Sequence, residues 1–213
     1  MSSTEDEHLA EFKDWWQRNG KPLVTGGLLA LVVVFGWQAF QKYQGNQSQG
    51  ASMLYQQLLE TTLTPTGKPD PAQVADLAGK LKKEFGGSTY AQYGSLFVAK
   101  VAVDTGKLDD AASELKAVAD KPNNPTLGEI ARQRLAQVLA AQNKADEALK
   151  LPDGDADKAF VATREELKGD LLVQLGRTDE ANAAYQKAKA ALSDEAAVGG
   201  LQIKLDDLAK GDA

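Results

Sequence analysis

The side chains that most often perform chemistry are scarce in this sequence of 213 residues. It has no cysteine and a single histidine, His8, which lies close to the N-terminus. The rest of the chain therefore offers no thiol nucleophile and no histidine base, and no Ser/His/Asp triad can be assembled there. Acidic residues are numerous, but their spacing singles out no pair for acid–base work. We expect that the protein is not an enzyme and uses no cofactor.

One acidic run, DGDAD (Asp153–Asp157), resembles the start of a calcium-binding loop. An EF-hand loop has glycine at its sixth position and glutamate at its twelfth. Counting from Asp153, these positions hold Lys158 and Arg164. The run is better explained as a solvated loop whose acid caps the following helix. We expect no metal site.

A long uncharged run determines where the rest of the chain is placed. It extends over 19 residues from Pro22 to Phe40, and at about 1.5 Å per helical residue it spans roughly 28 Å, close to the thickness of a bilayer core. Its centre, Leu28–Phe35, is apolar on every side of a helix, and no small-residue cleavage pattern follows it. The run predicts an uncleaved membrane anchor rather than a cleaved export signal or a soluble core helix.

The flanking charges predict the orientation of this anchor. Lys13, Arg18 and Lys21 precede it, and only Lys42 follows within the next 20 residues. Because positive flanks stay in the cytoplasm, the N-terminus is predicted to be cytoplasmic. The predicted segments are a cytoplasmic tail over 1–21, a transmembrane anchor over 22–41, a polar linker over 42–50 and a domain outside the cytosol over 51–213.

This outer domain has the sequence patterns of helices alone. No Val/Ile/Thr-rich alternating run follows the anchor, so the predicted fold class is all-α. In this domain, Asp70 before Pro71 predicts a helix start and Gly86-Gly87 predicts a helix end. In the tail before the anchor, Asn19-Gly20 predicts the end of a short helix. The whole chain has a formal net charge of −6, and most of this negative charge lies after the anchor. It would repel phosphate backbones on average, so no nucleic-acid partner is expected.

Three versions of one phrase indicate a repeat. In each, a helix ends at a Gly or Asn followed by Lys or Arg, and the next helix begins with an acidic pair and a small alanine. The small alanines of successive phrases are 37 and 33 residues apart, and these separations bracket the 34-residue period of tetratricopeptide (TPR) repeats. The phrases are TGKLDDAASEL (Thr105–Leu115), QNKADEALKL (Gln142–Leu151) and LGRTDEANAAY (Leu175–Tyr185). The predicted left-handed residues are Gly106, Asn143 and Gly176, and the alanines at close helix contacts are Ala111, Ala148 and Ala181.

The TPR pattern predicts a solenoid of antiparallel helical hairpins. Gly169 and Tyr185 match its glycine and its phenylalanine in the last repeat, whereas Pro152 shortens the middle one. The segment from Asp194 to Lys210 is predicted to be a terminal capping helix.

In TPR arrays the first helix of each hairpin lines a concave face, which suits an extended peptide or a partner's helix. Each such side chain can equally be part of a solvated helix face. The candidate protein-binding groove comprises Tyr93, Lys100, Gln133, Gln137, Glu166 and Asp170.

Several stretches resemble a known family over nearly the whole chain. They are FKDWWQRNGKPL, GWQAF, YGSLFVAKVAVDTGKLDDAASEL and LKGDLLVQLGRTDEANAAYQKA. With them the sequence resembles the YfgM-like family, the ancillary SecYEG translocon subunits of Gram-negative bacteria. The resemblance implies an inner-membrane protein with a periplasmic TPR-like domain and no catalytic motif. It also implies three kinds of partner, namely the SecYEG translocon, the membrane-anchored periplasmic chaperone PpiD and exported client proteins that are handed onward.

Two other functions are compatible with the same sequence. A structural scaffold for cell-envelope machinery would hold a fixed partner in the same groove instead of passing clients. A signalling protein would use the acidic cytoplasmic tail to restrain a response regulator.

Overall fold

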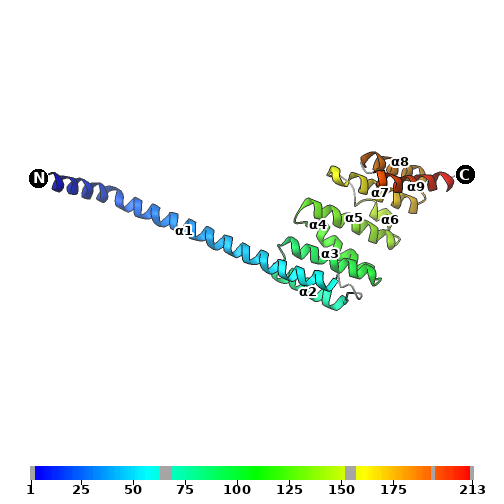
Figure 1. The fold of residues 1–213 in the computed structure, drawn as a ribbon, viewed down its shortest axis with the longest axis horizontal. Helices are drawn as coiled ribbons and strands as arrows, with labels where there is room; N and C mark the ends of the chain where they lie inside the picture. The colour runs from blue at the N-terminus through cyan, green and yellow to red at the C-terminus, as the bar shows by residue number, and fades with distance from the viewer. Residues whose placement is uncertain (1–2, 63–68, 152–156, 193–194, 212–213) are drawn as a thin grey trace. The chain divides into compact units, whose positions relative to one another are not determined.

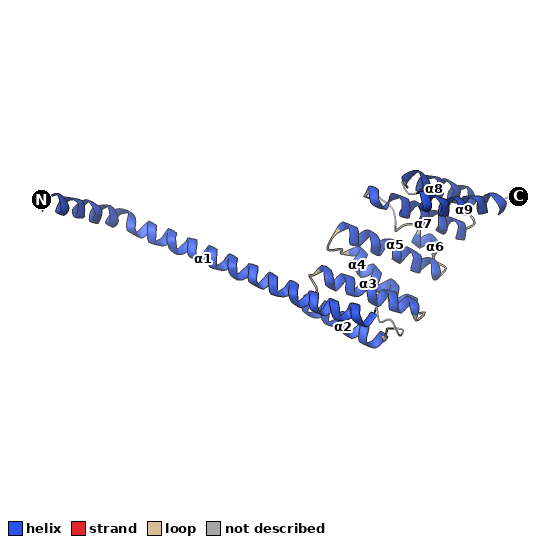
Figure 2. Cartoon of the chain, viewed as in Figure 1, coloured by secondary structure: helices blue, strands red, loops and turns tan. Residues whose placement is uncertain are grey.

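The computed structural model describes residues 3–62, 69–151, 157–192 and 195–211. Within these ranges the chain forms helices and no strands, which confirms the all-α prediction (Figure 2). The contacts divide the chain into two units, residues 1–49 and 50–213, and each is described by itself.

The first unit is helical throughout its described residues. Helix α1 (Ser3–Thr62) begins here and contains a stretch long and apolar enough to cross a membrane. Its large apolar side chains are exposed, for example Phe35 and Trp37. Exposed apolar surface of this extent is suited to lipid, as expected for the predicted anchor.

One prediction for this unit is wrong. The chain stays helical through Asn19 and Gly20, where a helix end was expected. The side chain of Asn19 donates a hydrogen bond from Nδ2 to the carbonyl of Trp15 at 3.1 Å, so it bonds back along the helix instead of ending it. Residues 42–50 are also helical, and their role as a linker stays a prediction.

The second unit is a series of helices that pack in chain order (Figure 1). The last turns of α1 belong to it, and Leu58 is buried there with Val74 and Leu81 of the next helix. The hairpins α3–α4, α5–α6 and α7–α8 follow, as expected for a TPR-like solenoid. The helices are α2 (Pro71–Phe85), α3 (Thr89–Asp104), α4 (Leu108–Asp120), α5 (Pro125–Ala141), α6 (Ala145–Ala148), α7 (Val161–Gln174), α8 (Thr178–Ala191) and α9 (Glu195–Gly211), with a short 3₁₀ helix, η1 (Lys158–Phe160), before α7.

The turn chemistry of the repeated phrase is confirmed. In every hairpin the residue predicted to be left-handed has a positive φ. The N–H of the residue after it, Lys107, Lys144 or Arg177, donates to the carbonyl five residues earlier at 2.8 to 2.9 Å. This is the Schellman arrangement, which satisfies carbonyls at the end of a helix. The φ values are 76° for Gly106, 61° for Asn143 and 71° for Gly176.

The close helix contacts are confirmed as well. Ala111, Ala148 and Ala181 each expose 0% of their surface. In the last hairpin, a Cβ added to Gly169 would lie 2.3 Å from the ring of Tyr185. Only glycine lets the two helix backbones approach each other over this ring. The alignment with the TPR pattern therefore holds at these positions.

The helix boundaries also follow their predicted signals. Asp70 accepts a hydrogen bond from the N–H of Ala72 at 2.9 Å and so caps α2, which ends at Phe85 before Gly86. Helix α6 has only four residues, in agreement with the shortened middle hairpin, although Pro152 itself lies outside the described residues. Helix α9 forms where the capping helix was predicted, with Leu201 buried against α8.

Candidate protein-binding groove

The six predicted groove residues lie on the first helices of three successive hairpins. The structure brings only Lys100 and Gln137 together, in one cleft, and places the other four in three different surroundings. The six predicted groove residues are Tyr93 and Lys100 on α3, Gln133 and Gln137 on α5, and Glu166 and Asp170 on α7.

The cleft lies between α3, α4 and α5 and has a volume of about 400 Å³. It exists because α4 packs against both α3 and α5 and forms the floor between them. Most of its lining is apolar, and Val103 exposes 42% of its surface there. The apolar lining consists of Leu96, Ala99, Val103, Leu108, Leu115, Val138 and Ala141, and the polar lining of Lys100, Asp104, Arg134 and Gln137.

The polar side chains of the cleft are not tied to one another across it. Lys100 donates from Nζ to Oδ2 of Asp104 at 2.6 Å, a pair within α3 with both side chains exposed. Such exposed pairs contribute little to stability, so these charges can exchange partners at small cost. Gln137 and Arg134 extend from α5 at the opposite side.

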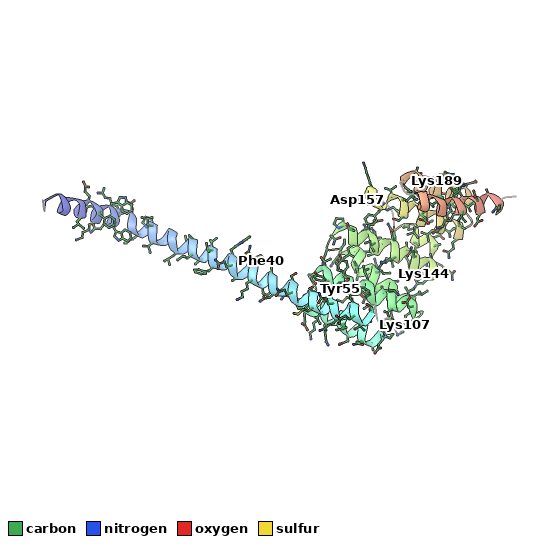
Figure 3. All side chains as sticks on the ribbon, viewed as in Figure 1. Phe40, Tyr55, Lys107, Lys144, Asp157 and Lys189 are labelled. Atoms are coloured by element: carbon green, nitrogen blue, oxygen red, sulfur yellow. The ribbon has the colours of Figure 1, made fainter. Side chains whose placement is uncertain are left out.

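An aromatic cluster continues the α3 side of the cleft. The ring of Tyr55, from the last turns of α1, lies 5.6 Å from the ring of Tyr93 and 6.1 Å from that of Phe97, and it sits against α3 in Figure 3. Tyr90 is 5.3 Å from Tyr55, and all four rings are half-buried. Burial, with the neighbouring phenols of Tyr93 and Tyr90, raises the pKa of Tyr55. Half-buried rings of this kind can pack against a partner's side chains.

Gln133 donates a hydrogen bond to the carboxylate of a buried ion pair, Glu129–Arg164, that joins α5 to α7. Its Nε2 donates to Oε1 of Glu129 at 3.0 Å, and Arg164 donates to both oxygens of the same carboxylate at 3.1 and 2.8 Å. Burial would raise the pKa of Glu129, but the hydrogen bonds from Arg164, Gln133 and Arg132 outweigh it and lower the pKa to about 2. This arrangement is structural, because its polar groups are satisfied within the chain.

Glu166 and Asp170 are engaged by the capping helix. Lys204 of α9 places Nζ 2.8 Å from Glu166 and 2.6 Å from Asp170. Tyr185 donates its hydroxyl to Asp170 at 2.7 Å, and Lys204 lies 5.5 Å from the centre of that ring. Burial lowers the pKa of Lys204, but the bonds to the two acids outweigh it and raise the pKa. The α7 part of the predicted groove is therefore occupied by the chain itself.

Sequence reasoning missed three side chains that shape this face. Phe97 follows Tyr93 by four positions on the same helix face, so helical spacing could have found it. Tyr55 and Lys204 reach the face from other helices, and nothing in their local sequence points to it.

The acidic run considered for calcium is mostly outside the described residues. Its last member, Asp157, accepts a hydrogen bond from the N–H of Ala159 at 3.2 Å and caps η1, which is the role expected of it. Among the described residues there is no cluster of three or more His, Cys, Asp or Glu side chains that could hold a metal ion.

Comparison with known proteins agrees with this architecture. The family model of the tetratricopeptide repeat-like domain matches residues 13–210. The chain belongs to this family. The TPR-like chain is also 27% identical to a protein of Escherichia coli (strain K12) over 96% of both chains. A protein of Neisseria gonorrhoeae (strain ATCC 700825 / FA 1090) is 28% identical over 96% of this chain and 97% of its own.

A third relative, from Aggregatibacter actinomycetemcomitans, is 28% identical over 87% of this chain and 88% of its own length. All three relatives are named ancillary SecYEG translocon subunit. These matches confirm the resemblance that the sequence motifs indicated.

Proposed function

We propose that this chain is a single-pass inner-membrane protein that binds segments of other proteins beside the SecYEG translocon and performs no chemistry. The observation that carries the proposal is the open, mostly apolar cleft between α3 and α5, in a chain similar to named translocon subunits over nearly its whole length. In this proposal the N-terminus is cytoplasmic and the TPR-like domain is periplasmic.

The anchor gives a weak binding site a useful concentration. A cleft of this size contacts a few side chains of a partner, which supports modest affinity. Tethering the cleft to the membrane close to the translocon raises its effective concentration for chains that emerge there. The partners in this proposal are the translocon itself, the chaperone PpiD and exported client proteins.

Photocrosslinking in living cells tests the binding face. We would place a photoreactive amino acid at Gln137, which lines the cleft, and as a control at Lys187, which is exposed on α8 and does not line it. We expect Gln137 to capture translocon subunits, PpiD or exported proteins, and Lys187 to capture far less. Equal capture from both positions would contradict a binding groove. Capture of one fixed partner without any exported chain would favour the scaffold function.

The orientation has a separate test. A reporter that is active only in the periplasm, fused after Ala213, should be active, and the intact mass should include the residues of the apolar run. An inactive fusion or a mature N-terminus near residue 40 would contradict the proposed topology.

A further inference from the structure

The α3–α5 cleft has a charged side chain at its edge, Arg134, that pairs with no acid among the residues that the structure describes. Arg134 is exposed on α5 and lines the cleft. Within the described part of the chain its guanidinium forms no ion pair or hydrogen bond. The other cation of the cleft, Lys100, is paired with Asp104. The polar edge of the cleft therefore carries one positive charge in excess.

The sequence around Arg134 explains why it has no ionic partner on its own helix. Other cations of this domain meet an acid three or four positions away on the same helix, as Lys80 does with Asp76 and Lys116 with Asp120. The corresponding positions around Arg134 hold Ile130, Ala131, Gln137 and Val138. Although the net charge of the chain is −6, the described residues thus leave this guanidinium without an acid beside an apolar cleft.

The lining of the cleft specifies the rest of the ligand. Val103 and Leu96 present apolar surface, and burying a bulky apolar side chain against such surface is favourable. From Tyr93 to Asp104 the face of α3 extends roughly 16 Å, which is the length of about five residues of extended peptide. A guanidinium prefers a carboxylate, which it can bind through two parallel hydrogen bonds.

We propose that the cleft selects short extended segments in which a bulky apolar residue enters the cleft and an acidic residue one or two positions away pairs with Arg134. The inference rests on the proposed function, because it names the class of segment that the groove would accept. The attraction at Arg134 would act against the overall charge of the chain, because a protein with this negative net charge repels an acidic segment on average.

Binding of short peptides to the full chain in nanodiscs of zwitterionic lipid tests the selection. The probes are fluorescent Gly/Ser-rich peptides with a Phe and, two positions later, an Asp, together with versions carrying Asn for Asp or Ala for Phe. We expect the Asp peptide to bind about three- to tenfold more tightly than the Asn peptide, and the Ala version to bind weakly. Equal binding of the Asp and Asn peptides would overturn the inference.

Three variants assign the selectivity to the cleft. Arg134→Gln should abolish the preference for Asp, so that the variant binds the Asp and Asn peptides with equal affinity. Lys187→Gln removes the same charge from α8 and should keep the preference. Val103→Trp should fill the cleft and abolish the binding of both peptides, with an unchanged helical circular dichroism spectrum. A preference for Asp that survives in Arg134→Gln would contradict the assignment.

The outcomes also separate this inference from the function on which it rests. If both peptides bind alike and Val103→Trp abolishes that binding, the groove is supported and the acid preference is wrong. If no peptide binds and photocrosslinkers at Gln137 capture nothing, both are wrong. If light scattering shows self-association that Arg134→Gln removes, and no peptide binds, a second copy of the chain occupies the cleft and the inference is overturned.

Discussion

The hairpins α3–α4 and α7–α8 follow the same repeat pattern but present different faces. On α3, Lys100 pairs within its own helix and the face beside it opens into the cleft. On α7, Glu166 and Asp170 are held by Lys204 from the next helix. The repeat pattern therefore determines how the two helices of a hairpin pack, whereas the element that follows determines whether the face of the first helix is open.

The inner contacts of the two hairpins show how one pattern accepts different residues. The first has Ala99 where the last has Gly169, and Leu115 where the last has Tyr185. The larger ring is paired with the smaller residue, since a Cβ at Gly169 would overlap the ring of Tyr185. Compensating volumes keep the packing dense in both.

The largest expected effect on stability is at the α5–α6 hairpin, which lies between the hairpins α3–α4 and α7–α8. Helix α6 has four residues, and the buried pair Glu129–Arg164 joins α5 directly to α7 beside it. Arg164→Leu should lower the free energy of unfolding by about 3 kcal/mol, because the Glu129 carboxylate stays buried without its main partner. Urea unfolding of the detergent-solubilised chain measures this change. Arg132→Gln removes the more exposed partner and should cost less than about 1 kcal/mol. An equal loss of unfolding free energy in Arg164→Leu and Arg132→Gln would show that the Glu129–Arg164 pair does not hold the two hairpins together.

The same pair predicts a dependence on pH. The pKa of Glu129 is lowered from 4.5 to about 2 in the folded chain. A group with a lowered folded pKa stabilises the fold fully above its unfolded pKa and loses this contribution as the pH falls towards the folded value. The difference in stability between the wild type and Arg164→Leu should therefore be largest near neutral pH and shrink as the pH falls towards about 2. A difference that does not change over this range would contradict the assignment.

A smaller effect is expected where the helices of the last hairpin meet. Ala181 is fully buried, so Ala181→Leu should overpack the contact and lower the stability by about 1 to 3 kcal/mol. Ala183→Leu makes the same change at an exposed position of α8 and should alter it by less than about 0.5 kcal/mol. Equal melting temperatures for the two variants would show that the repeat alignment is wrong in α8.

Features determined by neighbouring residues could be predicted from the sequence. Gly106 and Gly176 have the predicted positive φ, because a left-handed helix end depends on local backbone sterics. The stop expected at Asn19 was wrong, because the side chain bonds within a helix that continues. Contacts between distant residues had no local signal. Lys204 reaches Asp170 across 34 positions, and no helical periodicity connects them.

The smallest expected effect concerns the lysine that closes the α7 face. Lys204→Met should lower the stability by about 1 kcal/mol, because its apolar stem is kept while the bonds to two half-exposed acids are lost. Hydrogen exchange should increase in α9 and stay unchanged in α3. The matched control is Lys210→Met, whose side chain is 78% exposed and 3.9 Å from Asp207, and it should leave the exchange of α9 unchanged.

Lys204→Met also tests why the α3 face is open and the α7 face is closed. If Lys204 is what keeps Glu166 and Asp170 from meeting a partner, a photocrosslinker at Glu166 should capture little in the wild type and more in Lys204→Met, while one at Gln137 captures the same in both. Increased exchange in α9 without a gain at Glu166 would mean that the packing of Leu201 and Leu205 against α8 still covers the face. The open cleft at α3 and the closed face at α7 would then differ through the apolar packing of α9, and the ion pairs of Lys204 would only set its orientation.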